Sequence, residues 1–180
     1  RDLDNPRWLY VLPNGDVLVA ESKTERSGFG GKLYGWLSGE KGESANRITL
    51  LRDANGDGKP DLRAVFVSGL NQPFGMLLLG NTFYVANTDG ILTFPYQPGQ
   101  TKLTGAGRKI LDLPAGGYNN HWTRNVIANA DGSKIYVSVG SASNVGEYGM
   151  DKEVRRAAIL EMNPDGTQER IYASGLRNPV

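Results

Sequence analysis

The sequence has no cysteine and a single histidine, and these two shortages exclude whole classes of site. Without cysteine there is no disulfide framework, no thiolate-bound zinc or iron–sulfur cluster, and no thiol nucleophile. One histidine excludes any site that needs two, such as the paired-histidine zinc motif. Imidazole is the side chain best suited to proton transfer near neutral pH, so attention falls on His121.

The chain also lacks an excess of either charge. Its 20 Lys and Arg residues against 19 Asp and Glu residues give a formal net charge of +1 over 180 residues. A nucleic-acid-binding chain would carry a basic patch or tail, so we expect no nucleic-acid partner. No apolar run approaches the ~18–20 residues that a membrane span needs, so we expect no span in this chain.

Glycine is abundant, with 24 residues, roughly twice the usual share. One pattern recurs three times, in which an apolar stretch, an Asn/Asp/Gly turn and a second apolar stretch follow one another. It predicts β-hairpins over residues 8–20, 74–86 and 126–139. Asn-Gly and Asp-Gly supply the positive φ angles that tight hairpin turns require.

Each hairpin is expected to be followed by two more strands. The third strands are predicted over 31–37, 90–94 and 157–162, and the fourth strands over 47–51, 109–113 and 169–173. Four antiparallel strands per repeat make a propeller blade, so we predict an all-β fold of about three blades. A β-sandwich of similar hairpins is the alternative. Because three blades do not close a ring, we expect residues 1–180 to be one partial β-propeller domain, the N-terminal half of a larger propeller.

The segment 116–125, Gly-Gly-Tyr-Asn-Asn-His-Trp-Thr-Arg-Asn, is the first candidate for chemistry. It precedes a predicted first strand, which in a propeller places it at the mouth of the central channel. There His121 could transfer protons, Arg124 could clamp a carboxylate and Trp122 could stack on a ring. The alternative is a hydrogen-bonded loop histidine beside a core tryptophan. Arg177 and Asn178, in Gly-Leu-Arg-Asn-Pro, occupy the equivalent junction of the next repeat and would face the same mouth.

A second candidate is a metal site in the segment 53–61, Asp-Ala-Asn-Gly-Asp-Gly-Lys-Pro-Asp. Oxygen-bearing side chains at positions 1, 3, 5 and 9, with glycine at position 6, match the start of an EF-hand-type calcium loop. The ligands would be Asp53, Asn55, Asp57 and Asp61. Position 12 is Ala64 and not the expected Glu, so the alternative is an Asx/Gly-rich turn that joins two strands. A bound calcium ion would order the loop and not catalyse.

These segments together resemble the soluble quinoprotein sugar dehydrogenases, the glucose/sorbosone dehydrogenase family, whose members use pyrroloquinoline quinone (PQQ) on a six-bladed propeller. The resemblance extends over nearly the whole chain and is nearest to the sorbosone dehydrogenase-like branch. Its specific parts are the histidine loop and the Gly-x-Arg-Asn-Pro string. The other matching segments are 5–8, 14–21 and 69–75.

The resemblance implies a function and a set of roles. His121 matches the general base that takes the proton of the reacting sugar hydroxyl while hydride passes to C5 of PQQ. Arg177 and Asn178 match PQQ contacts, Arg177 also stabilising charge on the quinone oxygen, and Gln72 and Arg124 are weaker candidates for PQQ contact. The substrate would be an aldose or a sugar aldehyde, the cofactors PQQ and calcium, the electron acceptor unknown, and the location periplasmic or secreted.

One departure and two alternatives accompany this hypothesis. Glucose-oxidising members carry Asp before the base, where this chain has Asn120, which puts the substrate and the rate in question. The family's other cofactor contacts and its PQQ-bound calcium ligands belong to later blades, so this chain alone is expected to be inactive. A non-enzymatic propeller that recognises carbohydrate or protein is one alternative. A calcium-dependent propeller lactonase is the other.

Overall fold

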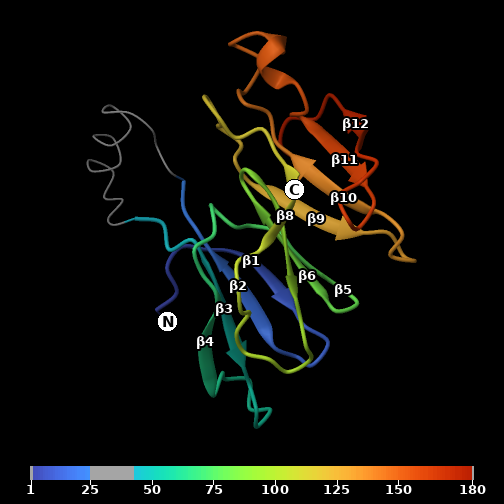
Figure 1. Ribbon diagram of the computed structural model, residues 1–180. Helices are drawn as coiled ribbons and strands as arrows, with labels where there is room; N and C mark the ends of the chain where they lie inside the picture. The colour runs from blue at the N-terminus through green and yellow to red at the C-terminus, as the bar shows by residue number, and fades with distance from the viewer. Residues whose placement is uncertain (1, 25–42, 180) are drawn as a thin grey trace.

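The protein is built from strands and turns (Figure 1). The computed structural model describes residues 2–24 and 43–179. Within these ranges twelve strands form three four-stranded antiparallel sheets, and one 3₁₀ helix, η1, spans Met150–Glu153. No helix in the described part is long and apolar enough to cross a membrane. The predicted all-β propeller fold with three four-stranded blades is confirmed.

The three sheets follow one another along the chain, each in simple strand order. The first blade contains β1 (Pro6–Val11), β2 (Val17–Glu21), β3 (Arg47–Arg52) and β4 (Leu62–Val67). The second contains β5 (Met76–Leu79), β6 (Thr82–Asn87), β7 (Gly90–Pro95) and β8 (Arg108–Asp112). The third contains β9 (Arg124–Ala128), β10 (Ile135–Val139), β11 (Ala158–Met162) and β12 (Arg170–Ser174).

The first blade differs from the sequence prediction in its second half. Residues 47–51 were expected to form its fourth strand, but β3 pairs directly with β2 and is the third strand. The fourth strand is β4, which pairs with β3 across the segment 53–61. The predicted strand over 31–37 lies outside the described residues. The segment 53–61 is therefore the hairpin connection that the alternative interpretation named.

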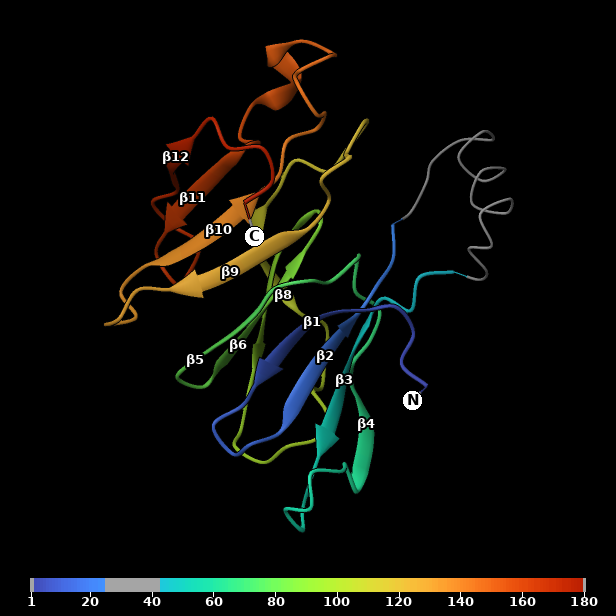
Figure 2. The ribbon, with the colours of Figure 1, turned by 180° about the vertical axis from the view of Figure 1, so that it is seen from behind.

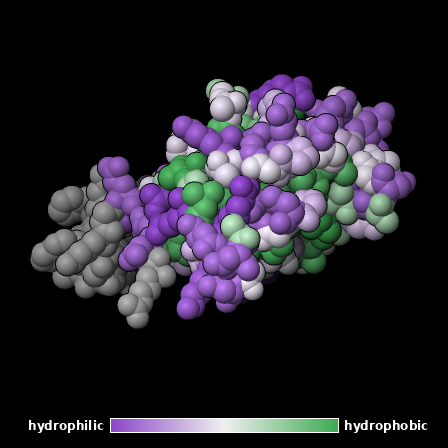
Figure 3. Space-filling model, turned by 90° about the horizontal axis from the view of Figure 1, so that it is seen from below, coloured by the Kyte–Doolittle hydropathy of each residue, from purple (hydrophilic) through white to green (hydrophobic). Residues whose placement is uncertain are grey.

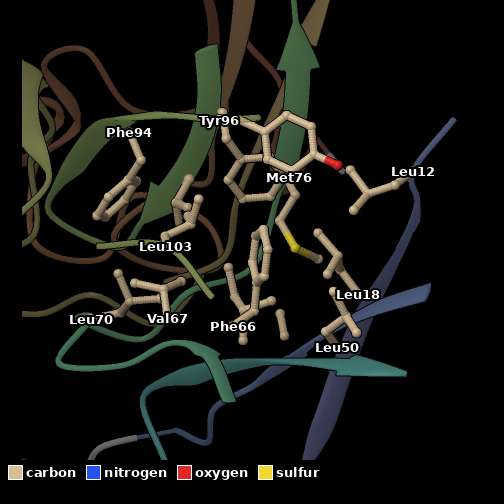
Figure 4. Packing of buried hydrophobic residues seen from close by; sticks show 14 residues of the cluster. Leu12, Leu18, Leu50, Phe66, Val67, Leu70, Met76, Phe94, Tyr96 and Leu103 are labelled. Carbon is tan, nitrogen blue, oxygen red and sulfur yellow. The ribbon is translucent and has the colours of Figure 1, made fainter. Parts of the chain in front are cut away.

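Two apolar cores hold the blades together, and the second blade contributes to both because side chains alternate between the faces of a strand. On β6, Phe83 and Val85 face the first blade, while Tyr84 and Ala86 face the third. Figure 4 shows the first core, where Phe66 of β4 and Met76 of β5 lie among leucines of the first blade. Stacking of one sheet on the next is what positions the loops at the blade ends.

The outward faces of the first and third blades carry exposed apolar side chains. Leu9 of β1 is 61% exposed and Ile127 of β9 is 60% exposed. Tyr136 and Tyr172 meet on the third blade at a ring-centroid distance of 5.1 Å. In Figure 3 apolar residues reach the surface between hydrophilic ones. Each middle-blade face, by contrast, is covered by a neighbouring sheet.

Antiparallel pairing sends two sets of connections to opposite ends of the blades. Loops that precede a first strand, follow a second strand or follow a fourth strand share one end. This end carries the segments 22–24, 68–75, 113–123, 140–157 and 175–179. The β3–β4 connection lies at the other end (Figures 1 and 2). The histidine loop and the Gly-x-Arg-Asn-Pro string are thus on the same side of the molecule, away from the segment 53–61.

Glu21, at the end of β2, is a fully buried carboxylate that joins the first blade to the N-terminal segment. Arg47 donates two hydrogen bonds of 3.0 Å to its two oxygens, and Thr49 and the backbone of Asp4 also donate to it. Burial raises the pKa of Glu21, and the hydrogen bonds from Arg47, Thr49 and Asp4 outweigh burial, so its pKa is lowered.

Glu21→Gln should destabilise the protein at neutral pH by about 1–3 kcal/mol, because buried donors lose a charged acceptor. A carboxyl with a lowered folded-state pKa stabilises the protein above its unfolded pKa, and this contribution disappears as the pH falls through the folded value. The variant's deficit should therefore shrink in acid. Urea unfolding at neutral and acidic pH measures this, with the exposed Asp151→Asn as control. A deficit that is the same at both pH values would contradict the assignment.

Candidate functional site

His121 lies in the loop before β9, and its ring is fixed by the loop that follows β10. Its Nδ1 lies 3.1 Å from the carbonyl oxygen of Ser141 and 2.9 Å from the Ser141 hydroxyl. The hydroxyl donates its single proton to the carbonyl of Ser143 at 2.5 Å. Nδ1 therefore faces two acceptors and carries the ring proton. The neutral imidazole then has its lone pair on Nε2, which is the atom that can act as a base.

The 141–143 turn is itself anchored by Glu153, the last residue of η1. Its carboxylate accepts hydrogen bonds from the backbone of Ala142 at 2.8 Å and of Ser143 at 3.1 Å, and from the Ser143 hydroxyl at 3.0 Å. A carboxylate that accepts several bonds from one turn holds that turn in a single conformation. Glu153 thus fixes Ser141, and through it the tautomer and orientation of His121.

Arg177 and Asn178 follow β12 and lie beside the histidine. The backbone carbonyl of Arg177 accepts from Ser141 N at 2.8 Å, and its exposed guanidinium donates to Asn144 Oδ1 at 2.5 Å. Asn120 donates to the same oxygen at 3.2 Å. Asn144 therefore bridges the residue before His121 to the Arg-Asn string. The structure brings the predicted set His121, Arg177 and Asn178 to one place.

Gly140 allows this close arrangement. A Cβ at that position would lie 2.5 Å from His121 Cβ, 2.7 Å from His121 O and 2.8 Å from Asn178 Oδ1. These separations are shorter than real Cβ contacts, so a side chain here must displace His121 or Asn178.

Gly140→Ala should displace His121 and lower thermal stability by an overpacking cost of about 1–3 kcal/mol. The His121 ring signal in the NMR spectrum should shift. Gly116→Ala, in the histidine loop, is the control for stability because an added Cβ there meets nothing within 4 Å. An unchanged His121 signal in Gly140→Ala would show that the close approach does not set the ring position.

Two other predicted cofactor contacts, Gln72 and Arg124, are buried and bonded to the protein. Gln72 donates to the carbonyl of Lys23 at 2.9 Å and holds the segment before β5. Arg124 is fully buried, and its Nη1 donates to the carbonyl of His121 at 2.6 Å. Trp122 is also buried, with its ring nitrogen donating to Thr24 at 3.0 Å. The structure gives these three residues supporting roles, and direct contact with a cofactor stays a prediction without geometric support.

The predicted calcium loop is a hydrogen-bonded turn at the opposite end of the first blade. Asp53 accepts from the backbone of Gly58 at 2.8 Å and Gly56 at 2.7 Å, and these bonds hold its pKa below the usual range. Asp61 accepts from Ala54 N at 2.7 Å. Asn55 and Asp57 likewise bond within the turn. Among the described residues no group of three or more His, Cys, Asp or Glu side chains is placed to hold a metal ion.

The sequence reasoning missed Ser141, Asn144, Glu153 and Arg156. The signal that could have found Ser141 and Asn144 is their repeat position, directly after a second strand. With the rest of the loop after β10 and the segment after β12, they border a hollow of about 640 Å³, within the ~300–1,000 Å³ range of small-molecule sites.

Comparisons with known proteins agree with this architecture. A family model described as a domain of unknown function, DUF7133, matches residues 4–178. The chain belongs to the DUF7133 family. The search of curated proteins gave no match for this DUF7133 chain.

Solved structures similar to the DUF7133 chain include sugar-oxidising enzymes. The holo PQQ domain of pyranose dehydrogenase from Coprinopsis cinerea has a TM-score of 0.71 at 22% identity, covering 99% of this chain and 41% of that one. The PQQ-bound aldose sugar dehydrogenase from Streptomyces coelicolor has a TM-score of 0.60 at 18% identity, covering 98% and 52%.

A calcium structure of the carbohydrate-active enzyme family AA12 from Trichoderma reesei has a TM-score of 0.62 at 16% identity, covering 98% and 38%. The DUF7133 chain thus spans about half or less of the length of these neighbours. At these identities the likeness shows the fold, which is that of PQQ-type sugar dehydrogenase domains.

Proposed function

We propose that the protein containing this chain is a PQQ-dependent dehydrogenase that oxidises an aldose or a sugar-derived aldehyde. The observation that carries the proposal is the His121 ring, whose Nδ1 faces two acceptors and whose Nε2 is left as a base. Near it lie the side-chain amides of Asn120, Asn144 and Asn178 and the exposed guanidinium of Arg177. The whole-protein activity is part of the proposal, as are export to the periplasm or outside the cell and the use of calcium.

The donor set fits the charge of PQQ, a planar tricarboxylate. Arg177 is exposed, and among the described residues its guanidinium donates to the neutral side chain of Asn144. Its charge is therefore free to meet an anionic group, and the neighbouring Asn178 adds an amide. Arg177 and Asn178 are the residues of this chain that would bind the cofactor. When bound, PQQ supplies an ortho-quinone that accepts a hydride from the carbon being oxidised.

This chain's own contribution is to receive a proton. A sugar hydroxyl that meets Nε2 of His121 transfers its proton there as its carbon is oxidised to a carbonyl. The resulting imidazolium keeps its Nδ1 proton directed at the Ser141 carbonyl, which stabilises the positive charge. Glu153 holds that carbonyl in place through the 141–143 turn.

The test is a dye-linked assay of the full-length protein, reconstituted with PQQ and calcium and offered a panel of aldoses and sugar aldehydes. The proposal predicts substrate-dependent dye reduction that needs PQQ. Protein without PQQ is the control. No PQQ binding and no dye reduction with any sugar would overturn the proposal.

A further inference from the structure

Two buried arginines lie beneath the loop that carries His121. Arg124 at the start of β9 is fully buried, and Arg156 before β11 is 6% exposed. No salt bridge among the described residues involves either guanidinium; Glu153 is near enough to raise the pKa of Arg156, but burial lowers that pKa more. Burying an unpaired cation is costly, so its hydrogen bonds must be important to the fold or the site.

Those hydrogen bonds go to the histidine loop. Arg124 donates to the carbonyls of His121 at 2.6 Å, Thr123 at 3.0 Å and Pro114 at 2.9 Å. Arg156 donates to the carbonyl of Gly116 at 3.3 Å. The loop between β8 and β9 has no strand or helix of its own in the described structure. Four carbonyls of this loop therefore accept from guanidinium groups, where loops ordinarily use backbone amides.

Asn119 links the two arginines. Its Oδ1 accepts from Arg156 at 2.6 Å and from Arg124 at 3.1 Å, while its amide donates to Thr88 of the second blade at 3.0 Å. Burial and, to a smaller extent, the nearby charge of Arg156 together lower the pKa of Arg124 to about 9. A pKa of about 9 leaves the Arg124 guanidinium charged at neutral pH.

We propose that Arg124, Arg156 and Asn119 form a clamp that positions the His121 ring for proton transfer. The inference rests on the proposed function for its catalytic consequence, but the clamp's effect on the ring does not. A guanidinium is a planar fork that can bond two acceptors in fixed directions, whereas a lysine ammonium cannot reproduce that geometry. Arg156 is the better position to test, because it reaches the loop without touching His121.

The experiment compares Arg156→Lys with Arg155→Lys in the full-length protein. Arg155 is the adjacent residue, and its guanidinium pairs with Glu169 on the surface. NMR of the imidazole nitrogens, with the His121 signal assigned by its loss in His121→Asn, reports the tautomer without any cofactor. We expect Arg156→Lys to reduce the Nδ1-protonated population and to lower kcat by about 10–10²-fold at little-changed KM. Arg155→Lys should alter neither.

The outcomes separate the clamp from the function. A changed His121 tautomer in Arg156→Lys, in a protein without dehydrogenase activity, supports the clamp and refutes the proposed function. An active protein whose tautomer and kcat are unchanged in Arg156→Lys refutes the clamp. Arg156→Met removes the charge as well as the fork; a His121 tautomer and kcat that are wild-type in Arg156→Lys but altered in Arg156→Met would show that charge alone, and not the planar fork, holds the loop. If Arg156→Lys does not fold, Asn119→Ala serves instead, and an unchanged His121 tautomer there overturns the proposal.

Discussion

His121→Asn should lower turnover of the PQQ-loaded full-length protein by about 10²–10⁴-fold, the usual contribution of a positioned general base. Asparagine keeps a polar group at the Nδ1 position that can still meet Ser141, but it has no basic nitrogen where Nε2 stood. The loss should therefore fall on kcat, while PQQ binding and thermal stability stay close to wild type.

Steady-state dye reduction and a PQQ titration of the same preparations measure this effect. The chain has no second histidine for a matched control, so retained PQQ binding shows that the site is intact. Turnover near the wild-type rate would exclude His121 as the base. Loss of PQQ binding together with turnover would assign His121 to cofactor binding.

Phe83→Ala should destabilise the protein by about 3–5 kcal/mol, the cost of removing a large ring from a packed core. Phe83 of β6 is fully buried between the first two blades. Its ring meets Phe66 of β4 edge-on, with centroids 5.4 Å apart, and Tyr10 of β1 at 6.3 Å. The substitution removes contacts on both sides of the junction between the blades.

Denaturant unfolding of the full-length protein measures the change in free energy. Phe83→Leu is the graded control, because it keeps most of the apolar volume and should cost less than Phe83→Ala. Equal stability of the wild type and Phe83→Ala would contradict the stacking of the first blade on the second.

The second and third blades could be predicted from sequence because their signals are local. Alternating apolar residues and Asn/Asp/Gly turns determine those strands, and their expected ranges overlap the observed ones. In the first blade β4 was missed. The segment 53–61 matches the start of a calcium-binding loop. That match obscured its role as the turn that connects β3 to β4.

The position of the site followed from repeat phase, since His121, Arg177 and Asn178 all occupy junctions at the same end of the blades. The support for the site did not follow. Arg124 was predicted to contact a cofactor because its residue type and loop are visible in sequence, whereas its burial is not. The hydrogen bonds from the 141–143 turn to Glu153 and from Arg156 to Asn119 join segments 10 to 37 residues apart. Local sequence patterns do not indicate contacts at such separations.

The most direct test of the central claim is rapid mixing of sugar with PQQ-loaded full-length protein, without any electron acceptor, while the absorbance of the bound cofactor is followed. The account predicts reduction of bound PQQ within the first turnover in the wild type, and PQQ that stays bound but oxidised over the same time in His121→Asn. A wild-type spectrum that no sugar changes, or equal reduction rates in the two proteins, would contradict it.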